Sequence, residues 1–210
     1  MIKPIYDRDG ITIFNADSRD VLPQIGPVDL LICDPPYGMS YQSNIRIVKK
    51  KKIHDDEILP IDLIMQASDK STRASYIFTR WDKLPSFPVP KSLLAWVKNG
   101  WSAGDLEHEH GRQWEACLFY AKPGHEFLHR IPDVLHYDRT NETSHPTEKP
   151  VSLFERLISA NVGDLILDPF MGCGPTLVAA KRCRRRAIGI EIDGDYCLEA
   201  IHRLEQKYLF

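Results

Sequence analysis

A short turn with the residue types of a binding site follows an apolar run near the start of the chain. The run LLIC leads directly into Asp34, Pro35, Pro36 and Tyr37. Because proline has no backbone N–H, this turn presents one carboxylate and several carbonyls with few competing donors. Such a surface suits an amino group that develops positive charge, and the Tyr37 ring offers a π-face to a planar group. A plain turn that ends a strand explains these four residues equally well, since short motifs have real false-positive rates.

A second apolar run, LILD, ends at Asp168 and leads into a turn that contains Gly172 and Gly174. Glycines between a strand and a helix let the backbone approach a ligand closely, and the helix N-terminus favours negative groups. Leu177 stands where a dinucleotide-binding fingerprint has its third glycine, and no P-loop lysine follows. This turn is therefore typical of a site for a nucleoside cofactor without a pyrophosphate, and a Rossmann oxidoreductase is disfavoured.

Two further strand-like runs are followed by acidic side chains. Glu191 in AIGIEI lies 19 residues after Gly172, which matches the spacing of about 20 residues at which an acidic side chain meets ribose hydroxyls. Asp17 follows ITIFNA and could accept a hydrogen bond from a purine amine at the same sheet edge. Asp17 before Ser18 is also a common helix cap, and Glu191 alone could be an ordinary strand end.

The composition limits the class of protein. The chain has 210 residues, of which 43% are hydrophobic and 27% charged, enough to bury the core of one domain. No apolar run reaches the roughly 18–20 residues of a membrane span, and the first residues lack a signal-peptide core, so we expect a soluble cytoplasmic protein. Five cysteines without a C-x-x-C pair argue against a disulfide framework. The net charge of −2 excludes whole-surface attraction to nucleic acid, but not a local basic face.

Strand-like and helix-like segments alternate along the chain. The expected strands are Ile11–Ala16, Asp29–Cys33, Ser75–Thr79, Leu93–Lys98, Ala116–Ala121, Leu165–Asp168 and Ala187–Ile192. The expected helices are Glu57–Ser68, Val151–Asn161, Thr176–Cys183 and Asp195–Tyr208. This alternation predicts one α/β domain, residues 1–210, with a doubly wound and mostly parallel sheet. Long polar stretches lie at 38–56 and, on either side of the strand expected at Ala116–Ala121, at 99–115 and 122–146. Loops this long are usually functional in compact domains.

Four motifs in a fixed order carry a family resemblance. DPPYG, SHPTEKP, LDPFMGCGPTLVAA and AIGIEID resemble the motifs of β-class amino-group DNA methyltransferases, and the match runs from about Asn15 to Leu204. The resemblance implies a seven-stranded S-adenosylmethionine-dependent methyltransferase sheet. The chain would be circularly permuted, because in that class the catalytic motif precedes the cofactor motif. The implied reaction is methyl transfer from S-adenosylmethionine to adenine N6 in DNA. Cytosine N4 is the alternative, although cytosine enzymes of the family more often have serine at the position of Asp34.

The resemblance also assigns roles to individual residues. The target base would be held by Asp34, Pro35, Pro36 and Tyr37. The cofactor would be bound by Asp17, Lys149, Pro150, Asp168, Phe170, Gly172, Gly174, Thr176 and Glu191. Among these, Glu191 would meet the ribose, Asp17 the adenine, and Lys149 with Pro150 the methionine moiety. Cys173-Gly174-Pro175 departs from the serine and threonine usual there, which puts side-chain contacts of that turn in doubt but not its backbone.

The implied chemistry needs an acceptor and access to DNA. We expect the Asp34 carboxylate and the Pro35 carbonyl to accept the two N–H bonds of a base amine, with the flipped-out base stacked on Tyr37. A basic run would hold the phosphates of double-stranded DNA. It consists of Arg46, Lys49, Lys50, Lys51 and Lys52. A solvated loop explains this run equally well. We expect DNA-recognition loops within 38–56 and 99–146. A monomer or homodimer is expected, with a cognate restriction enzyme as one conceivable partner.

The same residues bear on other classes of function. A non-catalytic nucleic-acid-binding module could keep the fold, but a dead copy has no reason to retain both the Asp34 turn and the glycine turn. The pair His108 and His110 forms an H-x-H without a third ligand at fixed spacing, so no metal site is expected.

Overall fold

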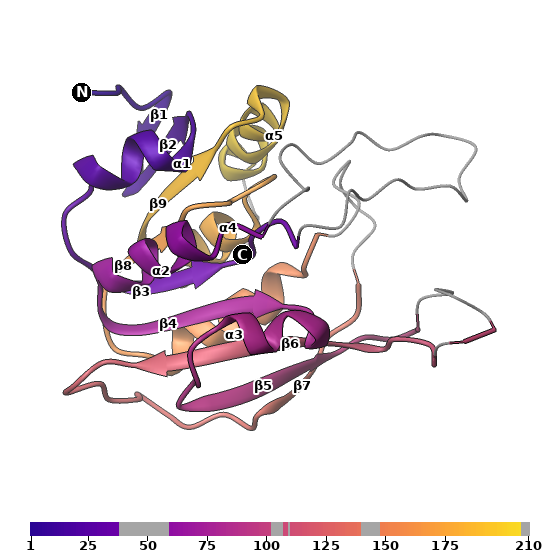
Figure 1. Cartoon of the computed structure of the whole chain (residues 1–210). Coiled ribbons are helices and arrows are strands. Elements are labelled where there is room, and N and C mark those ends of the chain that lie inside the picture. The colour runs from indigo at the N-terminus through magenta and orange to yellow at the C-terminus, as the bar shows by residue number, and fades with distance from the viewer. Residues whose placement is uncertain (38–58, 102–106, 109, 140–147, 207–210) are drawn as a thin grey trace.

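The computed structural model describes residues 1–37, 59–101, 107–108, 110–139 and 148–206. Within these residues one β-sheet of nine strands has the order β1-β2-β9-β8-β3-β4-β6-β5-β7 (Figure 1). Its strands are β1 (Tyr6–Arg8), β2 (Ile11–Asn15), β3 (Val28–Cys33), β4 (Ser71–Thr79), β5 (Ser92–Val97), β6 (Trp114–Ala121), β7 (Val134–His136), β8 (Leu165–Asp168) and β9 (Arg186–Glu191).

Five α-helices and two 3₁₀ turns connect the described strands. They are α1 (Ser18–Val21), η1 (Leu22–Gln24), α2 (Ile61–Lys70), η2 (Trp81–Ser86), α3 (Val151–Ala160), α4 (Pro175–Arg182) and α5 (Gly194–Glu205). Across the described residues, no helix combines the length and the apolar character that a membrane crossing requires.

The predicted α/β class is confirmed, and the expected strand count of seven is corrected to nine. All seven expected strands are present, and β1 and β7 extend the two edges of the sheet. Each added strand is three residues long and pairs with one neighbour, β1 with β2 and β7 with β5. Strands this short contain too few alternations to leave a period-two signal in the sequence.

The expected helices differ from the observed ones mainly at their ends. The sequence predicts the first helix over Glu57–Ser68, whereas α2 runs from Ile61 to Lys70, and residues 57 and 58 lie outside the described residues. The last helix is predicted to reach Tyr208, but α5 ends at Glu205 because the backbone of Gln206 is extended (φ −60°, ψ 124°). Residues 207–210 lie outside the described part.

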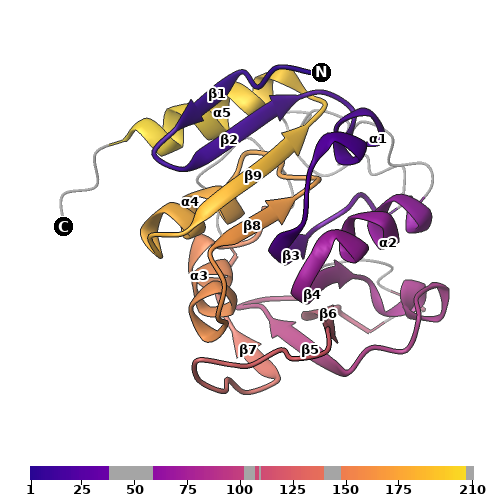
Figure 2. The ribbon, with the colours of Figure 1, turned by 90° about the vertical axis from the view of Figure 1, so that its left-hand side faces the viewer.

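The point at which the sheet changes winding direction lies between β3 and β8. The strands β2, β9, β8, β3 and β4 are mutually parallel neighbours, and β6 is antiparallel to both β4 and β5. From β8 the chain passes through α4 to β9, whereas from β3 it passes through α2 to β4 on the other side (Figure 2). Ligands of open α/β sheets bind beyond the carboxyl ends of the strands at such a switch point.

Helices cover both faces of the sheet, which explains the continuous apolar runs of the strands. Apolar residues of α3, α4 and α5 pack on one face together with Leu30 and Ile32. Residues of α1 and α2 pack on the other face with Leu31 and Cys33. Alternate residues of β3 are therefore buried on opposite sides, and β3 is held rigidly in the middle of the molecule.

The second and last strands of the chain are neighbours, as the predicted circular permutation requires. β2 pairs in parallel with β9, and their register joins Asn15 to Glu191. Arg8 also lies 3.6 Å from Glu205 at the end of α5. The chain can therefore complete the sheet although its cofactor motif follows its catalytic motif.

Candidate active site

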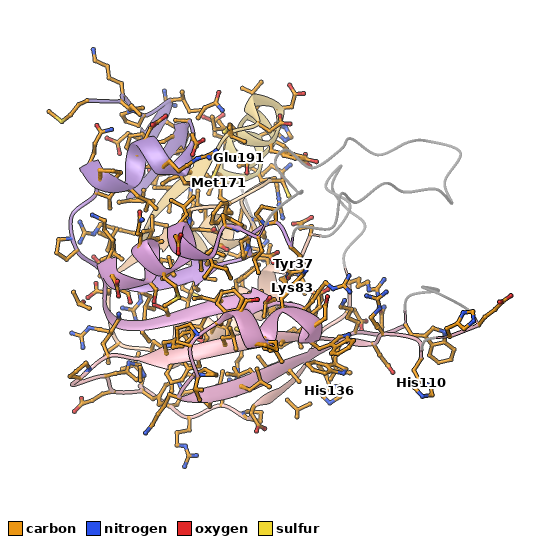
Figure 3. The ribbon with its side chains drawn as sticks, viewed as in Figure 1. Tyr37, Lys83, His110, His136, Met171 and Glu191 are labelled. Atoms are coloured by element: carbon orange, nitrogen blue, oxygen red, sulfur yellow. The ribbon has the colours of Figure 1, made fainter. Side chains whose placement is uncertain are left out.

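The two motif turns emerge side by side at the carboxyl edge of the sheet. β3 and β8 pair through Leu31 and Leu167, so Asp34 and Asp168 leave adjacent strands at the same edge. In Figure 3 the labelled Tyr37 lies beyond the end of β3, and Met171 belongs to the turn that follows β8. The structure thus brings together the turn predicted to hold a base and the turn predicted to hold a cofactor.

The Asp34 carboxylate is held through one of its two oxygens. Oδ1 accepts hydrogen bonds from the Tyr37 hydroxyl at 2.8 Å and from Lys149 Nζ at 2.5 Å. Among the described residues, no hydrogen bond reaches Oδ2. The side chain is 23% exposed, so a ligand at the sheet edge can use the second oxygen as an acceptor.

Lys149 is the buried cation of the site. Its side chain is 2% exposed, and Nζ lies 3.1 Å from Glu115 Oε2 in addition to its contact with Asp34. Three aromatic rings surround the ammonium, those of Phe78 at 4.9 Å, Tyr37 at 5.4 Å and Trp96 at 5.7 Å. Burial alone lowers the pKa of Lys149, but the two carboxylates more than offset it and raise the pKa above its usual value. Lys149 is therefore a permanent cation beside Asp34.

Glu115, at the start of β6, completes this cluster. Its Oε2 lies 3.1 Å from the Tyr37 hydroxyl, whose single proton is shared between Glu115 and Asp34, and it forms ion pairs with Lys149 and Lys98. Burial works to raise the pKa of Glu115, but the two ammonium groups lower it to about 2. Glu115 is thus an anion with two cationic partners, whereas Asp34 has one.

Sequence reasoning did not identify this arrangement. The Asp34 turn was expected to be rich in acceptors with few donors, and Lys149 from the segment before α3 supplies the missing donor. Glu115 carried one usable signal, a charged residue that opens the otherwise apolar strand EACLFYA. Pairing of Glu115 with Lys98 and Lys149 depends on the strand order, which the sequence pattern alone does not give.

The glycine turn after β8 is joined to the end of β9 by hydrogen bonds from backbone N–H groups to the Glu191 carboxylate. Glu191 Oε2 accepts from the Gly172 N–H at 3.0 Å, and its Oε1 accepts from the Asp193 N–H at 2.8 Å. Gly174 has φ +75°, and a Cβ there would lie 2.8 Å from the Cβ of Ala200. Only glycine combines that left-handed backbone with the close approach of α5.

Negative charge accumulates at this turn. Burial, together with the nearby Asp34 and Glu191 carboxylates, raises the pKa of Asp168 to about 7, and the hydrogen bond from the Phe170 N–H reduces the rise. Burial also raises the pKa of Glu191. Buried carboxylates that lack a cation favour a positively charged ligand, because such a ligand restores their preference for ionisation.

Arg203 on α5 connects the glycine turn to the segment that carries Lys149. Its Nη1 donates to the Cys173 carbonyl at 2.9 Å and lies 2.8 Å from Glu148 Oε1. Glu148 is 2% exposed in its side chain, and its neighbour Lys149 reaches Asp34. A single guanidinium therefore fixes parts of both turns relative to each other.

The remaining predicted site residues have the following positions. Asp17 caps α1 by accepting from the Arg19 N–H at 2.8 Å and pairs with the Arg19 guanidinium at 2.6 Å. Pro150 directly precedes α3, and Thr176 is buried at the start of α4. The cofactor roles given to these residues and to Lys149 stay predictions. The basic run Arg46 and Lys49 to Lys52 lies outside the described residues.

Comparisons with known proteins identify the family to which the chain is similar. A family model described as DNA methylase, for N6- and N4-directed enzymes, matches residues 49–202. The DNA adenine methyltransferase YhdJ of Escherichia coli (strain K12) is 44% identical over 249 aligned positions, which cover 95% of this chain and 84% of that protein. The type II methyltransferase M.HpaI of Haemophilus parainfluenzae is 41% identical over 85 residues, but this match covers 40% of the chain and 26% of that enzyme.

Two solved structures have a similar fold. The complex of M1.HpyAVI with S-adenosylmethionine superposes with a TM-score of 0.70 at 26% identity, and covers 92% of this chain and 99% of that one. The cytosine-N4-specific PvuII DNA methyltransferase superposes with a TM-score of 0.73 at 14% identity, over 99% of this chain and 91% of that one. The second likeness concerns the fold alone.

Proposed function

The chain belongs to the DNA methylase family whose enzymes modify the exocyclic N6 or N4 amines of bases, and from this premise we propose that it methylates adenine N6 in double-stranded DNA. The observation that carries the proposal is the Asp34 carboxylate at the switch point of the sheet, with Oδ1 bound to Tyr37 and Lys149. The 44% identical relative is named a DNA adenine methyltransferase, which supports adenine as the target.

The family uses S-adenosylmethionine, and we propose that the glycine turn after β8 binds it. When bound, S-adenosylmethionine supplies an electrophilic methyl group on a positively charged sulfur. The buried carboxylates of Asp168 and Glu191, with their raised pKa values, suit such a cation. We assign the binding to the turn of Phe170, Gly172 and Gly174, and keep Asp17, Lys149, Pro150 and Thr176 as proposed contacts.

In the proposed reaction Asp34 and Pro35 act on the amine of the target base. The lone pair of an aromatic amine is delocalised into the ring, which makes it a poor nucleophile. Asp34 Oδ2 and the Pro35 carbonyl would accept its two N–H bonds and localise that lone pair. As the nitrogen forms its bond to the methyl carbon, the carbon–sulfur bond breaks and the neutral thioether leaves, so positive charge moves from sulfur to nitrogen, next to acceptors that are already in place. The methylated amine then releases one N–H proton. Pro36 gives the turn its rigid backbone.

A base inside a duplex cannot reach the Asp34 turn, so the proposal requires base flipping. We propose that the flipped base stacks on the Tyr37 ring, whose hydroxyl is fixed by Asp34 and Glu115. DNA phosphates would be contacted from residues 38–56 and 99–146, with Arg46, Lys49, Lys50, Lys51 and Lys52 as the proposed cations. We further propose that the protein acts in the cytoplasm, where it would meet cellular DNA. A monomer or homodimer and a cognate restriction enzyme as partner are also proposals.

Cytosine N4 is the second candidate, because the family model covers both N6- and N4-directed enzymes and both bases present an aromatic amine. Incubation with labelled S-adenosylmethionine and unmethylated genomic DNA, followed by nucleoside chromatography, separates the two. We expect label in N6-methyladenine. Label in N4-methylcytosine would contradict the adenine assignment, and the absence of labelled nucleoside with a cofactor-binding protein would favour a non-catalytic binding module.

A further inference from the structure

The cluster around Lys149 contains a carboxylate that the proposed reaction does not use. Glu115 lies on β6, two strands away from β3 in the order β3-β4-β6, and Asp34 directly follows β3. It is in register with Trp96 of β5, on the face of the sheet that α3 covers. Its side chain is 19% exposed, and that of its partner Lys98 is 10% exposed. Removing a charged pair this far from open solvent costs desolvation free energy, which only close and well-oriented contacts offset.

The contacts of Glu115 lead directly to the residues of the target-base site. Glu115 Oε2 lies 3.1 Å from the Tyr37 hydroxyl and 3.1 Å from Lys149 Nζ. Those two groups are also the donors to Asp34 Oδ1. Both side-chain donors that Asp34 has among the described residues are therefore shared with Glu115.

Charge balance explains what the sharing does. Asp34, Glu115, Lys149 and Lys98 together contribute two negative and two positive charges. If Glu115 lost its charge, Lys149 would pair with Asp34 alone and would neutralise it more completely. Asp34 would then be a weaker acceptor for a base amine, because a bound cation competes for the same electron density.

We propose that Glu115 is a positioning residue for methyl transfer, which acts by holding Lys149 and Tyr37 so that Asp34 stays an open, strongly accepting carboxylate. Glu115 contacts neither the base nor the cofactor in this role. Lys98 neutralises the remaining charge of Glu115 and fixes its direction. The inference rests on the proposed role of Asp34 but not on the choice between adenine and cytosine, since both present an aromatic amine.

The test compares E115Q with the wild-type enzyme at saturating S-adenosylmethionine and DNA. The substituted glutamine side chain would keep the size of Glu115 and its contact with Tyr37 but not the charge. We expect kcat to fall about 10- to 100-fold, in the range found when one preorganised polar contact is weakened. The dissociation constant for S-adenosylmethionine is expected to stay within about twofold, because Glu115 lies outside the glycine turn.

The matched control is E155Q, which removes the charge of another ion-paired glutamate, Glu155 with Arg182, between α3 and α4. E155Q is expected to retain wild-type kcat. The proposal is overturned if E115Q keeps kcat within about twofold of wild type, or if E155Q loses as much.

The double variant E115Q/K98Q separates positioning from mere stability. It removes one charge of each sign and leaves no unpaired Lys98, so it is expected to fold even if E115Q does not. We expect its kcat to remain low, because Lys149 still pairs with Asp34 alone. Recovery of wild-type kcat would show that an unpaired Lys98 caused the loss, and would overturn the proposal. Label in methylcytosine from the wild-type enzyme would overturn only the adenine assignment.

Discussion

Asp34 and Asp168 leave adjacent parallel strands at the same edge of the sheet, and the charge of Asp34 affects the ionisation of Asp168. Burial and the neighbouring Asp34 charge raise the pKa of Asp168 to about 7. Asp34 has Lys149 as a cationic partner at 2.5 Å, whereas the carboxylate of Asp168 accepts a hydrogen bond from the neutral Phe170 N–H at 3.1 Å and has no ion pair among the described residues. Among the described residues, the glycine turn therefore keeps an acid without a cationic partner, at the place where we propose that the sulfonium cofactor binds.

Cofactor binding should depend on pH through Asp168. Its folded-state pKa is raised to about 7, so below pH 7 the free enzyme holds a proton there that a cationic ligand must displace. Affinity for S-adenosylmethionine is therefore expected to rise with pH between about 6 and 8, with a slope approaching about tenfold per unit on the acid side. Titration calorimetry across this range measures the slope.

The variant D168N supplies the control for this prediction. It removes the ionisation but keeps the size of the side chain, so its affinity should be lower and nearly independent of pH. A wild-type affinity that stays constant from about pH 6 to 8 would show that Asp168 does not exchange a proton on cofactor binding.

Gly174 should not tolerate a methyl group. G174A places a Cβ 2.8 Å from Ala200 Cβ at a backbone with φ +75°. The left-handed backbone and the overpacking should together destabilise the fold by roughly 2–4 kcal/mol, seen as a lower thermal midpoint, and weaken cofactor binding. G26A is the matched control, because nothing lies within 4 Å of a Cβ there. Equal thermal midpoints for the two variants would contradict the close approach of α5.

Loss of Arg203 should weaken the link between the two turns. R203M leaves Glu148, 2% exposed in its side chain, without its guanidinium partner. Removal of one member of a buried ion pair typically costs about 3–5 kcal/mol, and we expect both stability and cofactor affinity to fall. R8M, which removes an exposed pair with Glu205, should change stability by less than about 1 kcal/mol. The link is refuted if R203M unfolds in denaturant at the same midpoint as R8M.

The elements of the fold could be predicted where buried strands leave a continuous apolar signal. LLIC and LILD each gave a strand whose carboxyl end was expected to carry chemistry, and β3 and β8 end at the two turns of the candidate site. The three-residue strands β1 and β7 could not be predicted, because their pairing depends on β2 and β5 being present first.

The candidate site could be predicted only to the level of local motifs. Asp34, Tyr37, Gly172 and Glu191 are recognisable because each lies in a short motif at a strand end. Glu115 belongs to the same cluster as Asp34 but is 81 residues away in sequence, and its contacts arise through tertiary pairing across β4. The ion pair of Lys149 with Asp34 is likewise a product of the fold.

The most direct test of the whole account is the rate of methyl transfer by D34A in a single turnover, with bound S-adenosylmethionine and DNA in excess. We predict a loss of at least about 100-fold, the scale seen when one preorganised transition-state contact is removed, while the cofactor dissociation constant changes little. A variant that binds the cofactor normally and methylates DNA at close to the wild-type rate would contradict the assignment of Asp34 as the acceptor for the base amine.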